Sequence, residues 1–317
     1  MEKNALIRSK QAQALVSSKK EEETVREVIS EIWSESTRKT YRSLWNSWVA
    51  WCQLHSAPLQ ATEMGMMRFA AHLANEKKST TTIITAITAI RHVHEGSSGL
   101  VPLPPASKKF KAFIQGLKKR LKHRSVKKTP LTVEMLKKVI DGDMSLVPIE
   151  KALLVWGFLT GFRSEEIVRL RLSDIEEKPQ GLKVSLSHSK ANQEGKEEFV
   201  ALTSKSSLYS ELYEWYEIRK KESTDPEAWI FPSPRTSRAH ISKRTYARLI
   251  KRCAEFLEMD PSAFAGHSTR RGLATSLAER GLPLHQISRQ LRHKDPRSTM
   301  EYIEETNAFE NAPTSKL

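Results

Sequence analysis

The 317-residue chain contains only two cysteines, no long hydrophobic run and fewer acidic than basic residues. Cys52 and Cys253 lie far apart in the sequence, which argues against a disulfide framework or a four-ligand zinc site and favours buried thiols. Because there is neither an apolar segment long enough to span a bilayer nor a cleavable signal of the usual form, we expect a soluble, intracellular protein. Internal repeats and low-complexity segments are not evident.

The charge balance favours a polyanionic partner. Lysine and arginine number 52 against 37 aspartates and glutamates, which gives a formal net charge of +15 and a pI near 9.7. Nucleic acid is the first candidate and a membrane surface is the rival, which the missing span and signal disfavour. At this length, with 38% hydrophobic residues, the chain is large enough for about two domains and a substantial core.

Helical periodicity dominates the first part of the chain, after a charged arm predicted over residues 1–34. Apolar residues recur at three- and four-residue spacing from Tyr41 to Cys52, which predicts a buried helix face that includes Trp45 and Trp48. These aromatics would also suit a base-stacking platform, but the helical spacing favours packing. Further helices are predicted over residues 62–75, 80–94 and 110–121. The result is an all-helical domain over residues 35–121.

A basic run, KKRLKHRSVKK, covers residues 118–128 and is followed by Pro130. Proline disfavours a helix in the residue before it, so we place a linker between domains at residues 122–130. A charge run of this kind is as often a solvated face as a DNA contact. If it contacts DNA, it adds affinity without sequence information. The candidate phosphate-binding residues are Lys118, Lys119, Arg120, Lys122 and Arg124.

The second domain, residues 131–317, is predicted to be mostly helical with a small antiparallel β-sheet. Apolar and polar residues alternate over residues 181–188, and residues 197–202 form the partner strand after a polar turn. The predicted fold class is therefore mainly α. The helices are expected over residues 131–140, 150–159, 206–221, 243–258, 268–280 and 284–291.

Five side chains in this domain suit phosphodiester cleavage without a metal: Arg163, His267, Arg270, His293 and Tyr302. A planar guanidinium pairs with the charged non-bridging oxygens of a phosphate, an imidazole transfers protons, and a phenol forms a covalent intermediate. Each signal is weak alone. An H-x-x-R match arises often by chance, and a single arginine is usually an exposed residue with a local ion pair.

Two local patterns place these residues on helices. Glu166 follows Arg163 by three residues, which predicts that both share one helix face. Residues 298–301 have the form of a capping box, which predicts a helix start there with Tyr302 in its first turn. A phenol has a pKa of about 10, so Tyr302 needs nearby cations or a base to attack near neutral pH.

The order of these residues resembles the tyrosine recombinase (phage integrase) family, whose motifs run arginine, lysine on a β-turn, H-x-x-R, His or Trp, and tyrosine. Here these positions are Arg163, Lys190, His267, Arg270, His293 and Tyr302. The resemblance extends to the first domain, where SWVAWC at residues 47–52 looks like the Cre-like group. His293 departs from Cre, which has tryptophan there.

The resemblance implies strand exchange through a covalent 3′-phosphotyrosine at Tyr302, with no metal or nucleotide cofactor. Arg163 and Arg270 would hold the scissile phosphate, while His267 would handle protons. His293 would hydrogen bond a non-bridging oxygen.

Two further roles are implied by the same resemblance. Lys190 is the candidate general acid for the departing 5′-hydroxyl, and Lys183 and Lys196 flank the same hairpin as alternatives. Glu166 would orient the arginine clamp without reacting.

Other residues are candidates for recognising DNA. The predicted helix over residues 243–258 is basic, and Arg244 is the best candidate for contacting a guanine edge, although a solvated helix face is as frequent. Lys243 and Arg248 accompany it. By similarity to Cre, groove-facing positions in the first domain are Arg38, Lys39, Thr81, Thr82 and Thr85.

Two alternatives stay open: an architectural DNA-binding protein that no longer cleaves, and a type IB topoisomerase or telomere resolvase. The family implies a homotetramer on two double-stranded DNA sites with inverted repeats, with a dimer on each site, and residues 307–309 are expected to dock on a neighbour. We expect DNA association in the cytoplasm, or in the nucleus of a eukaryotic host, and a role in a mobile element.

Overall fold

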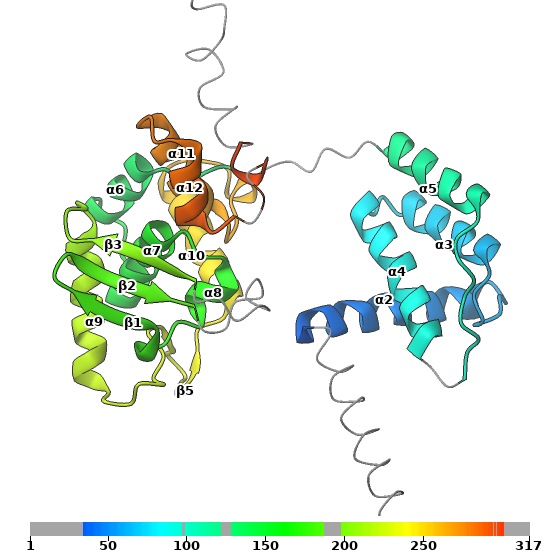
Figure 1. Ribbon diagram of the computed structural model, residues 1–317, viewed down its shortest axis with the longest axis horizontal. Helices are drawn as coiled ribbons and strands as arrows, with labels where there is room; N and C mark the ends of the chain where they lie inside the picture. Colours follow the sequence, from blue (N-terminus) through cyan, green and yellow to red (C-terminus); the bar gives the residue numbers. More distant parts are fainter. Residues whose placement is uncertain are drawn as a thin grey trace, which may run out of the picture. The chain divides into compact units, whose positions relative to one another are not determined.

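The structure is a computed structural model that describes residues 34–96, 99–121, 128–186, 198–293, 295 and 297–300. The chain forms two compact units that divide between Ser125 and Val126. The predicted fold class is confirmed, since helices dominate and the sheets are small and antiparallel (Figure 1). None of the described helices combines the length and apolar character that a membrane span requires.

The first unit contains four described helices: α2 (Glu35–Leu54), α3 (Glu63–Asn75), α4 (Thr80–Gly96) and α5 (Lys108–Leu121). Ser34 and Thr62 cap α2 and α3, since their side chains accept hydrogen bonds from the first-turn amides. The core is built around Trp48, Trp51 and Phe69. The aromatic residues of α2 therefore pack in a core, as the helical spacing predicts, although Trp51, outside the predicted face, is buried while Trp45 is only half-buried.

The beginning of the basic run belongs to α5 and not to the linker. Lys118, Lys119 and Arg120 form the last turn of this helix and are exposed. Phe110 and Leu117 anchor the opposite face in the core, and cations at a helix C-terminus interact favourably with the helix dipole, so the helix continues into the run. Lys122 and Arg124 lie outside the described residues.

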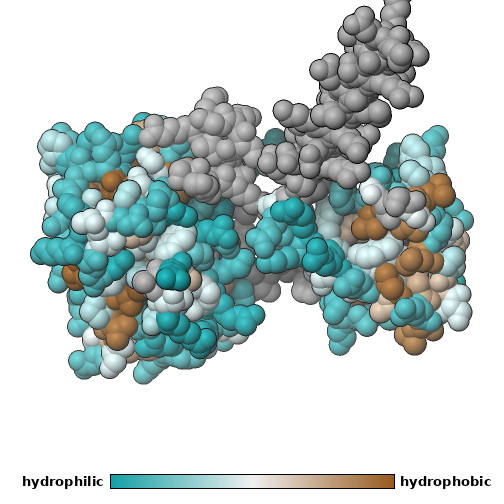
Figure 2. Space-filling model, turned by 90° about the horizontal axis from the view of Figure 1, so that it is seen from below, coloured by the Kyte–Doolittle hydropathy of each residue, from teal (hydrophilic) through white to brown (hydrophobic). Residues whose placement is uncertain are grey.

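Figure 2 shows hydrophobic side chains on the surface of the first unit, whereas the face of the second unit in that view is mostly hydrophilic. The first unit exposes large apolar residues at the end of α2, at the start of α3 and in the loops beside them. They are Leu54 (75% exposed), Leu59, Met64 and Val101 (67%). Apolar surface of this kind is typical of a contact with another molecule.

The second unit is mostly helical. Its described helices are α6 (Val133–Asp141), α7 (Pro148–Thr160), α8 (Ser164–Val168), α9 (Tyr209–Glu222), α10 (Lys243–Phe256), α11 (Ser268–Glu279) and α12 (Leu284–Leu291), with 3₁₀ turns at Leu172–Asp174 and Pro261–Ala263. α7 is buried on nearly every side and packs against α9 and α11. This central position of α7 fixes the segment that follows it, which carries Phe162 and Arg163.

The sheet has one strand more than predicted. β1 (Ile175–Lys178), β2 (Gly181–Ser185) and β3 (Phe199–Thr203) form an antiparallel sheet in the order β1-β2-β3. β1 reads IEEK with only Ile175 buried, so it has no apolar alternation to reveal it. A second hairpin, β4 (Pro232–Ser233) with β5 (Thr236–His240), is also absent from the prediction.

Two glycines permit the close packing on which the site depends. Gly161 ends α7 in the left-handed conformation with φ 61°, which turns the chain toward α8. Gly266 lies against α8, because a Cβ at this position would come within 2.2 Å of the Ser164 Oγ. The segment before α11 therefore approaches the start of α8 closely.

Candidate active site

Arg163 and Glu166 form a pair at the start of α8. The Arg163 amide donates to Glu166 Oε2 at 2.8 Å, and its guanidinium donates to Oε1 at 2.8 Å. The predicted pairing is therefore found, but Arg163 is the residue before the helix and does not share its face. The Arg163 side chain is 40% exposed while that of Glu166 is 6% exposed. A buried carboxylate thus fixes a guanidinium that reaches solvent.

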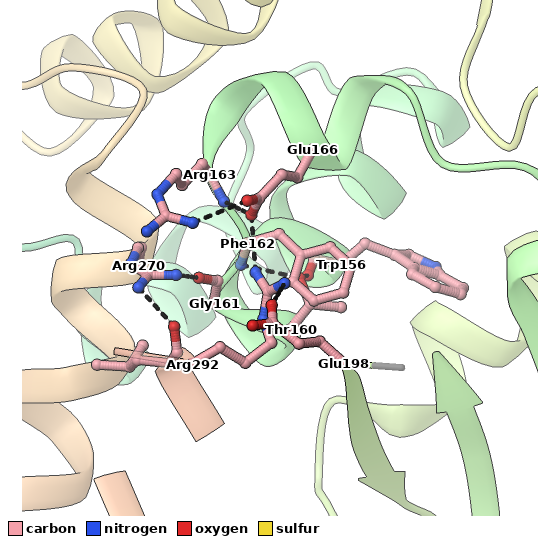
Figure 3. A network of polar contacts seen from close by, with 10 residues as sticks. Trp156, Thr160, Gly161, Phe162, Arg163, Glu166, Glu198, Arg270 and Arg292 are labelled. Carbon is pink, nitrogen blue, oxygen red and sulfur yellow. Dashed lines mark hydrogen bonds and ion pairs between the residues drawn. The ribbon is translucent and has the colours of Figure 1, made fainter. Parts of the chain in front are cut away.

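Arg270 lies in the first turn of α11 and is buried. Its guanidinium donates at 2.5 Å to the backbone carbonyls of Gly161 and Leu291, at the ends of α7 and α12 (Figure 3). Carbonyls at helix ends have no partner within the helix, so this one side chain satisfies two of them. The three helices are thereby joined at the site by a single cation.

Two histidines lie in the field of these arginines. Partial burial and the guanidiniums of Arg270 and Arg163 lower the pKa of His267, which keeps solvent contact. Burial together with Arg270, Arg163 and Arg292 lowers the pKa of His293 to about 4. Both imidazoles are therefore neutral near pH 7. The structure brings four of the predicted residues into one positive region, which suits an anion.

A chain of hydroxyls orients the ring of His293. Ser288 Oγ lies 2.7 Å from Thr299 Oγ1, which lies 2.6 Å from His293 Nδ1. The Thr299 hydroxyl thus bonds Nδ1 of His293 and the Ser288 hydroxyl at the same time, with one proton in each hydrogen bond. Thr299 is fully buried, which holds this geometry in place.

Two residues of the Glu166 network, Arg292 and Glu198, were not indicated as site residues by the sequence. Arg292 donates to Glu166 Oε2 at 2.7 Å, and its guanidinium lies 3.5 Å from Glu198 Oε2 and 4.5 Å from the centre of the Phe162 ring. Figure 3 shows the guanidiniums of Arg163 and Arg292 meeting the Glu166 carboxylate from different directions. Only the adjacency of Arg292 to His293 hinted at this role, because nothing in the sequence reveals its burial.

Tyr302 and Lys190 lie outside the described residues, as does Lys196. Residues 297–300 are helical, so the helix begins before the predicted capping box at Ser298. The reason is Asp295, whose carboxylate accepts from the Arg297 amide at 2.9 Å. Lys183, the other alternative general acid, lies on β2, with its ammonium 3.7 Å from Glu176 and 5.0 Å from the centre of the Phe199 ring.

The candidate DNA-reading residues lie on helix surfaces. Lys243, Arg244 and Arg248 are exposed on α10, and Lys243 forms an ion pair with Glu165 at 3.0 Å. Arg38 and Lys39 are exposed on α2, where Lys39 pairs with Glu35.

The three candidate threonines line the first turns of α4. Thr81 is exposed, whereas Thr82 and Thr85 are half-buried. Their hydroxyls already have local partners, since Thr82 bonds Ser79 and Thr85 donates to the Thr81 carbonyl. A DNA contact at Thr82 or Thr85 would therefore use the remaining acceptor capacity of the hydroxyl.

The part of the chain that the structure describes contains no group of three or more His, Cys, Asp or Glu side chains suited to a metal ion. Cys52 and Cys253 are both buried, free thiols. Burial raises the pKa of Cys253 to about 12, so it stays protonated.

Acid should destabilise the second unit before its carboxylates titrate. The folded pKa of His293, about 4, lies below its ordinary value of 6.5, so the unfolded chain binds protons first as the pH falls. The stability is complete above pH 6.5 and declines toward pH 4. Because His293 is only half-buried, we expect a loss of about 1 kcal/mol. Urea unfolding at pH 7.5 and 5.0 measures the free energy of unfolding at each pH. The difference between the two values should be smaller in His293→Gln and unchanged in His285→Gln, since His285 is exposed.

Comparison with known proteins identifies the family to which the chain belongs. The model of the phage integrase family matches residues 113–308. The chain belongs to that family. It is 27% identical over 299 residues to an integrase/recombinase xerD homolog of Selenomonas ruminantium, across 90% of this chain and 86% of the relative. It is therefore a site-specific recombinase of the tyrosine type, as its residue order predicts.

Solved structures show the same integrase fold. A lambda integrase dimer bound to a COC′ core site is 16% identical, covers 88% of this chain and 92% of its own, and has a TM-score of 0.60. The Tn1549 transposon integrase in complex with transposon right end DNA is 17% identical, covers 85% and 89%, and has a TM-score of 0.59. At these identities the likeness concerns the fold alone.

Proposed function

We propose that this phage integrase family member exchanges DNA strands through a covalent 3′-phosphotyrosine at Tyr302. The observation that carries the proposal is the joint placement of Arg163 and Arg270 beside two neutral histidines. Two guanidiniums neutralise the charge that develops on the non-bridging oxygens of a phosphate during displacement. A neutral imidazole can accept a proton or donate a hydrogen bond without adding a charge.

The proposed chemical step combines Tyr302 and Lys190 with the described site residues. The Tyr302 hydroxyl oxygen attacks phosphorus and the bond to the 5′-oxygen breaks. The phenol proton passes to His267, whose lowered pKa leaves it unprotonated near pH 7. Lys190 protonates the leaving 5′-oxygen, and His293 donates its Nε2–H to a non-bridging oxygen. Glu166 orients Arg163 and does not react.

The reverse step completes the exchange. A 5′-hydroxyl of a second strand gives its proton to Lys190 and attacks the phosphotyrosine. A new phosphodiester forms, the bond from phosphorus to the Tyr302 oxygen breaks, and His267 returns the phenol proton. Each cleaved bond is retained as a phosphotyrosine ester, so religation needs no nucleotide. The exposed cations of α10, with Arg244 at their centre, would contact the major groove, and Arg38, Lys39 and the threonines of α4 would contact the same duplex from the first unit.

The function is tested with a plasmid that carries the DNA flanking the coding sequence, incubated with the protein in EDTA. A covalent protein–DNA adduct together with recombinant products is the expected result. DNA binding without an adduct would favour an architectural protein. An adduct with relaxation only, without recombinants, would favour a topoisomerase.

Replacing Thr299 by valine should slow cleavage about tenfold while DNA affinity stays within threefold, because Nδ1 of His293 loses the hydroxyl that orients its ring. Single-turnover cleavage of a nicked site measures the change. Ser288→Ala is the matched control, since it removes only the outer hydroxyl. It should slow cleavage less than threefold. Equal losses in the two variants would contradict the role of Thr299.

We also propose a homotetramer on two inverted-repeat sites. Contacts between protomers would bury the apolar surface that includes Leu54 and Val101. The segment over residues 307–309 would dock on a neighbouring protomer. A groove of about 700 Å³ in the second unit, lined by Leu273, Leu277 and Leu282, is its candidate receptor.

Removal of residues from Thr306 onward should therefore weaken assembly more than binding to a single site. We expect at least a tenfold loss of paired-site complexes in a gel-shift titration, with single-site affinity within threefold, because docking links protomers and not protein to DNA. Leu277→Glu in the full chain should produce the same pattern. Unchanged assembly after truncation would contradict the docking.

A further inference from the structure

Arg292 occupies a backbone position that strongly favours glycine. It ends α12 with φ 53° and ψ 46°, in the left-handed region, where a side chain on Cβ costs free energy. The other described non-glycine residues with positive φ are Ser56, Lys77 and Glu258, and all three are exposed. The Arg292 side chain, by contrast, is only 5% exposed. A strained backbone and a buried cation coincide at this one residue.

Stability alone does not explain why a cation is buried there. Nε and Nη1 of Arg292 have no hydrogen-bond partner in the described part of the chain, and neither has Oε2 of Glu198. For a buried ion pair with incomplete hydrogen bonding, the free-energy cost of desolvation usually exceeds the electrostatic attraction between the two charges. Strained residues of this kind cluster at functional sites, where the surrounding structure holds them in place.

The contacts of Arg292 join three separate elements. Its guanidinium donates to Glu166 on α8, faces Glu198 just before β3, and lies over the ring of Phe162 after α7. The Glu198 carbonyl accepts from the Leu186 amide at 3.0 Å, which closes the base of the segment that contains Lys190. His293 follows Arg292 directly, so the conformation of Arg292 also directs the backbone into that histidine.

The charges explain what this arrangement achieves. Glu166 is shared, with Oε1 accepting from the Arg163 guanidinium and Oε2 from Arg292. Without Arg292, the whole charge of a buried carboxylate would face Arg163 and oppose its contact with a phosphate. With Arg292, that charge is balanced by a second cation, which bonds the other carboxylate oxygen of Glu166. Arg163 then keeps its orientation from Glu166 and retains its positive charge for the substrate.

We propose that Arg292 is a positioning residue for strand cleavage, which balances Glu166 so that Arg163 can bind the scissile phosphate and holds His293 and the base of the Lys190 segment in register. This inference rests on the proposed function. Arg292 acts through these neighbours and does not contact the substrate itself.

The test combines two substitutions, Arg292→Met and Glu166→Gln. Arg292→Met removes the positive charge and retains a long side chain that fills much of the same space. Single-turnover cleavage of a nicked site and equilibrium DNA affinity are measured for the wild type, both single variants and the double variant. We expect Arg292→Met to slow cleavage about 30-fold with affinity within threefold. In the double variant, loss of the unbalanced carboxylate should restore cleavage at least fivefold above Arg292→Met. A merely structural role would give no recovery, since a second buried group is then also lost.

Two outcomes would overturn the proposal: cleavage by Arg292→Met within threefold of the wild type, or a double variant no faster than Arg292→Met. Thermal unfolding reports whether Arg292→Met folds. If it does not, Arg292→Gln, which also removes the charge but can still donate a hydrogen bond to Glu166, replaces it under the same criteria. Failure of the wild-type protein to form an adduct would contradict the proposed function, and this inference with it. If the wild-type protein cleaves and the Arg292 variant cleaves at the same rate, only this inference is contradicted.

Discussion

Arg270→Lys is expected to slow strand cleavage by about 10²–10³-fold while DNA affinity stays within threefold. Arginine has five N–H donors in one plane, and Arg270 commits two nitrogens to the carbonyls of Gly161 and Leu291. It can therefore hold the ends of α7 and α12 and bind a phosphate at the same time. Lysine keeps the charge but cannot make these directional contacts together, and removal of one such donor typically costs about 2.7–4 kcal/mol in the transition state.

The measurement is single-turnover adduct formation on a nicked site, with thermal unfolding to verify the fold. Arg280→Lys is the matched control, because Arg280 lies at the other end of α11, is 52% exposed and bonds Ser276 and Glu134. It should cleave at the wild-type rate. If Arg270→Lys cleaved within threefold of the wild type, Arg270 would not be a phosphate ligand.

Replacing the five basic residues around the domain boundary with glutamine should greatly reduce the salt dependence of DNA binding. Each phosphate contact contributes about 0.9 to the slope of log affinity against log salt concentration, so five contacts contribute about 4.5. Between 50 and 200 mM salt, this part of the slope corresponds to a change in affinity of roughly 500-fold. The variant should therefore bind much more weakly at low salt, and its affinity should fall less steeply than that of the wild type as salt is raised. The changed residues are Lys118, Lys119, Arg120, Lys122 and Arg124.

A charge-matched control separates contact from net charge. Five exposed lysines elsewhere are replaced by glutamine in a second protein, and gel-shift titrations at four salt concentrations are compared. If the slope of log affinity against log salt concentration falls equally in both variants, the basic run acts through overall charge and not through phosphate contacts. The control residues are Lys109, Lys111, Lys137, Lys138 and Lys205.

Elements with strong amphipathic periodicity could be predicted almost to the residue. The predicted range for the helix after Pro283 matches α12 exactly as Leu284–Leu291, and α10 begins at Lys243 as expected. In both, a polar face alternates with buried positions such as Ile287 and Leu249, so the period is visible in the sequence.

What escaped prediction lacks a local signal. β1 is a strand because Ile175 pairs opposite Val184, although three of its four residues are charged and exposed. Arg292 belongs to the site because Glu166 and Glu198, far away in sequence, converge on it. Contacts of this kind depend on the tertiary fold. The roles of Tyr302 and Lys190 stay predictions, since both lie outside the described residues.

The attack of the Tyr302 hydroxyl on a phosphate held by Arg163 and Arg270 is tested most directly by mapping the protein–DNA adduct. The nicked site is incubated with the wild-type protein, the adduct is digested, and the peptide that carries the nucleotide is sequenced by mass spectrometry. The account predicts a 3′-phosphate ester on Tyr302 and no adduct with Tyr302→Phe, which removes one oxygen and retains the ring. A nucleotide on another residue, or an adduct that persists in Tyr302→Phe, would contradict it.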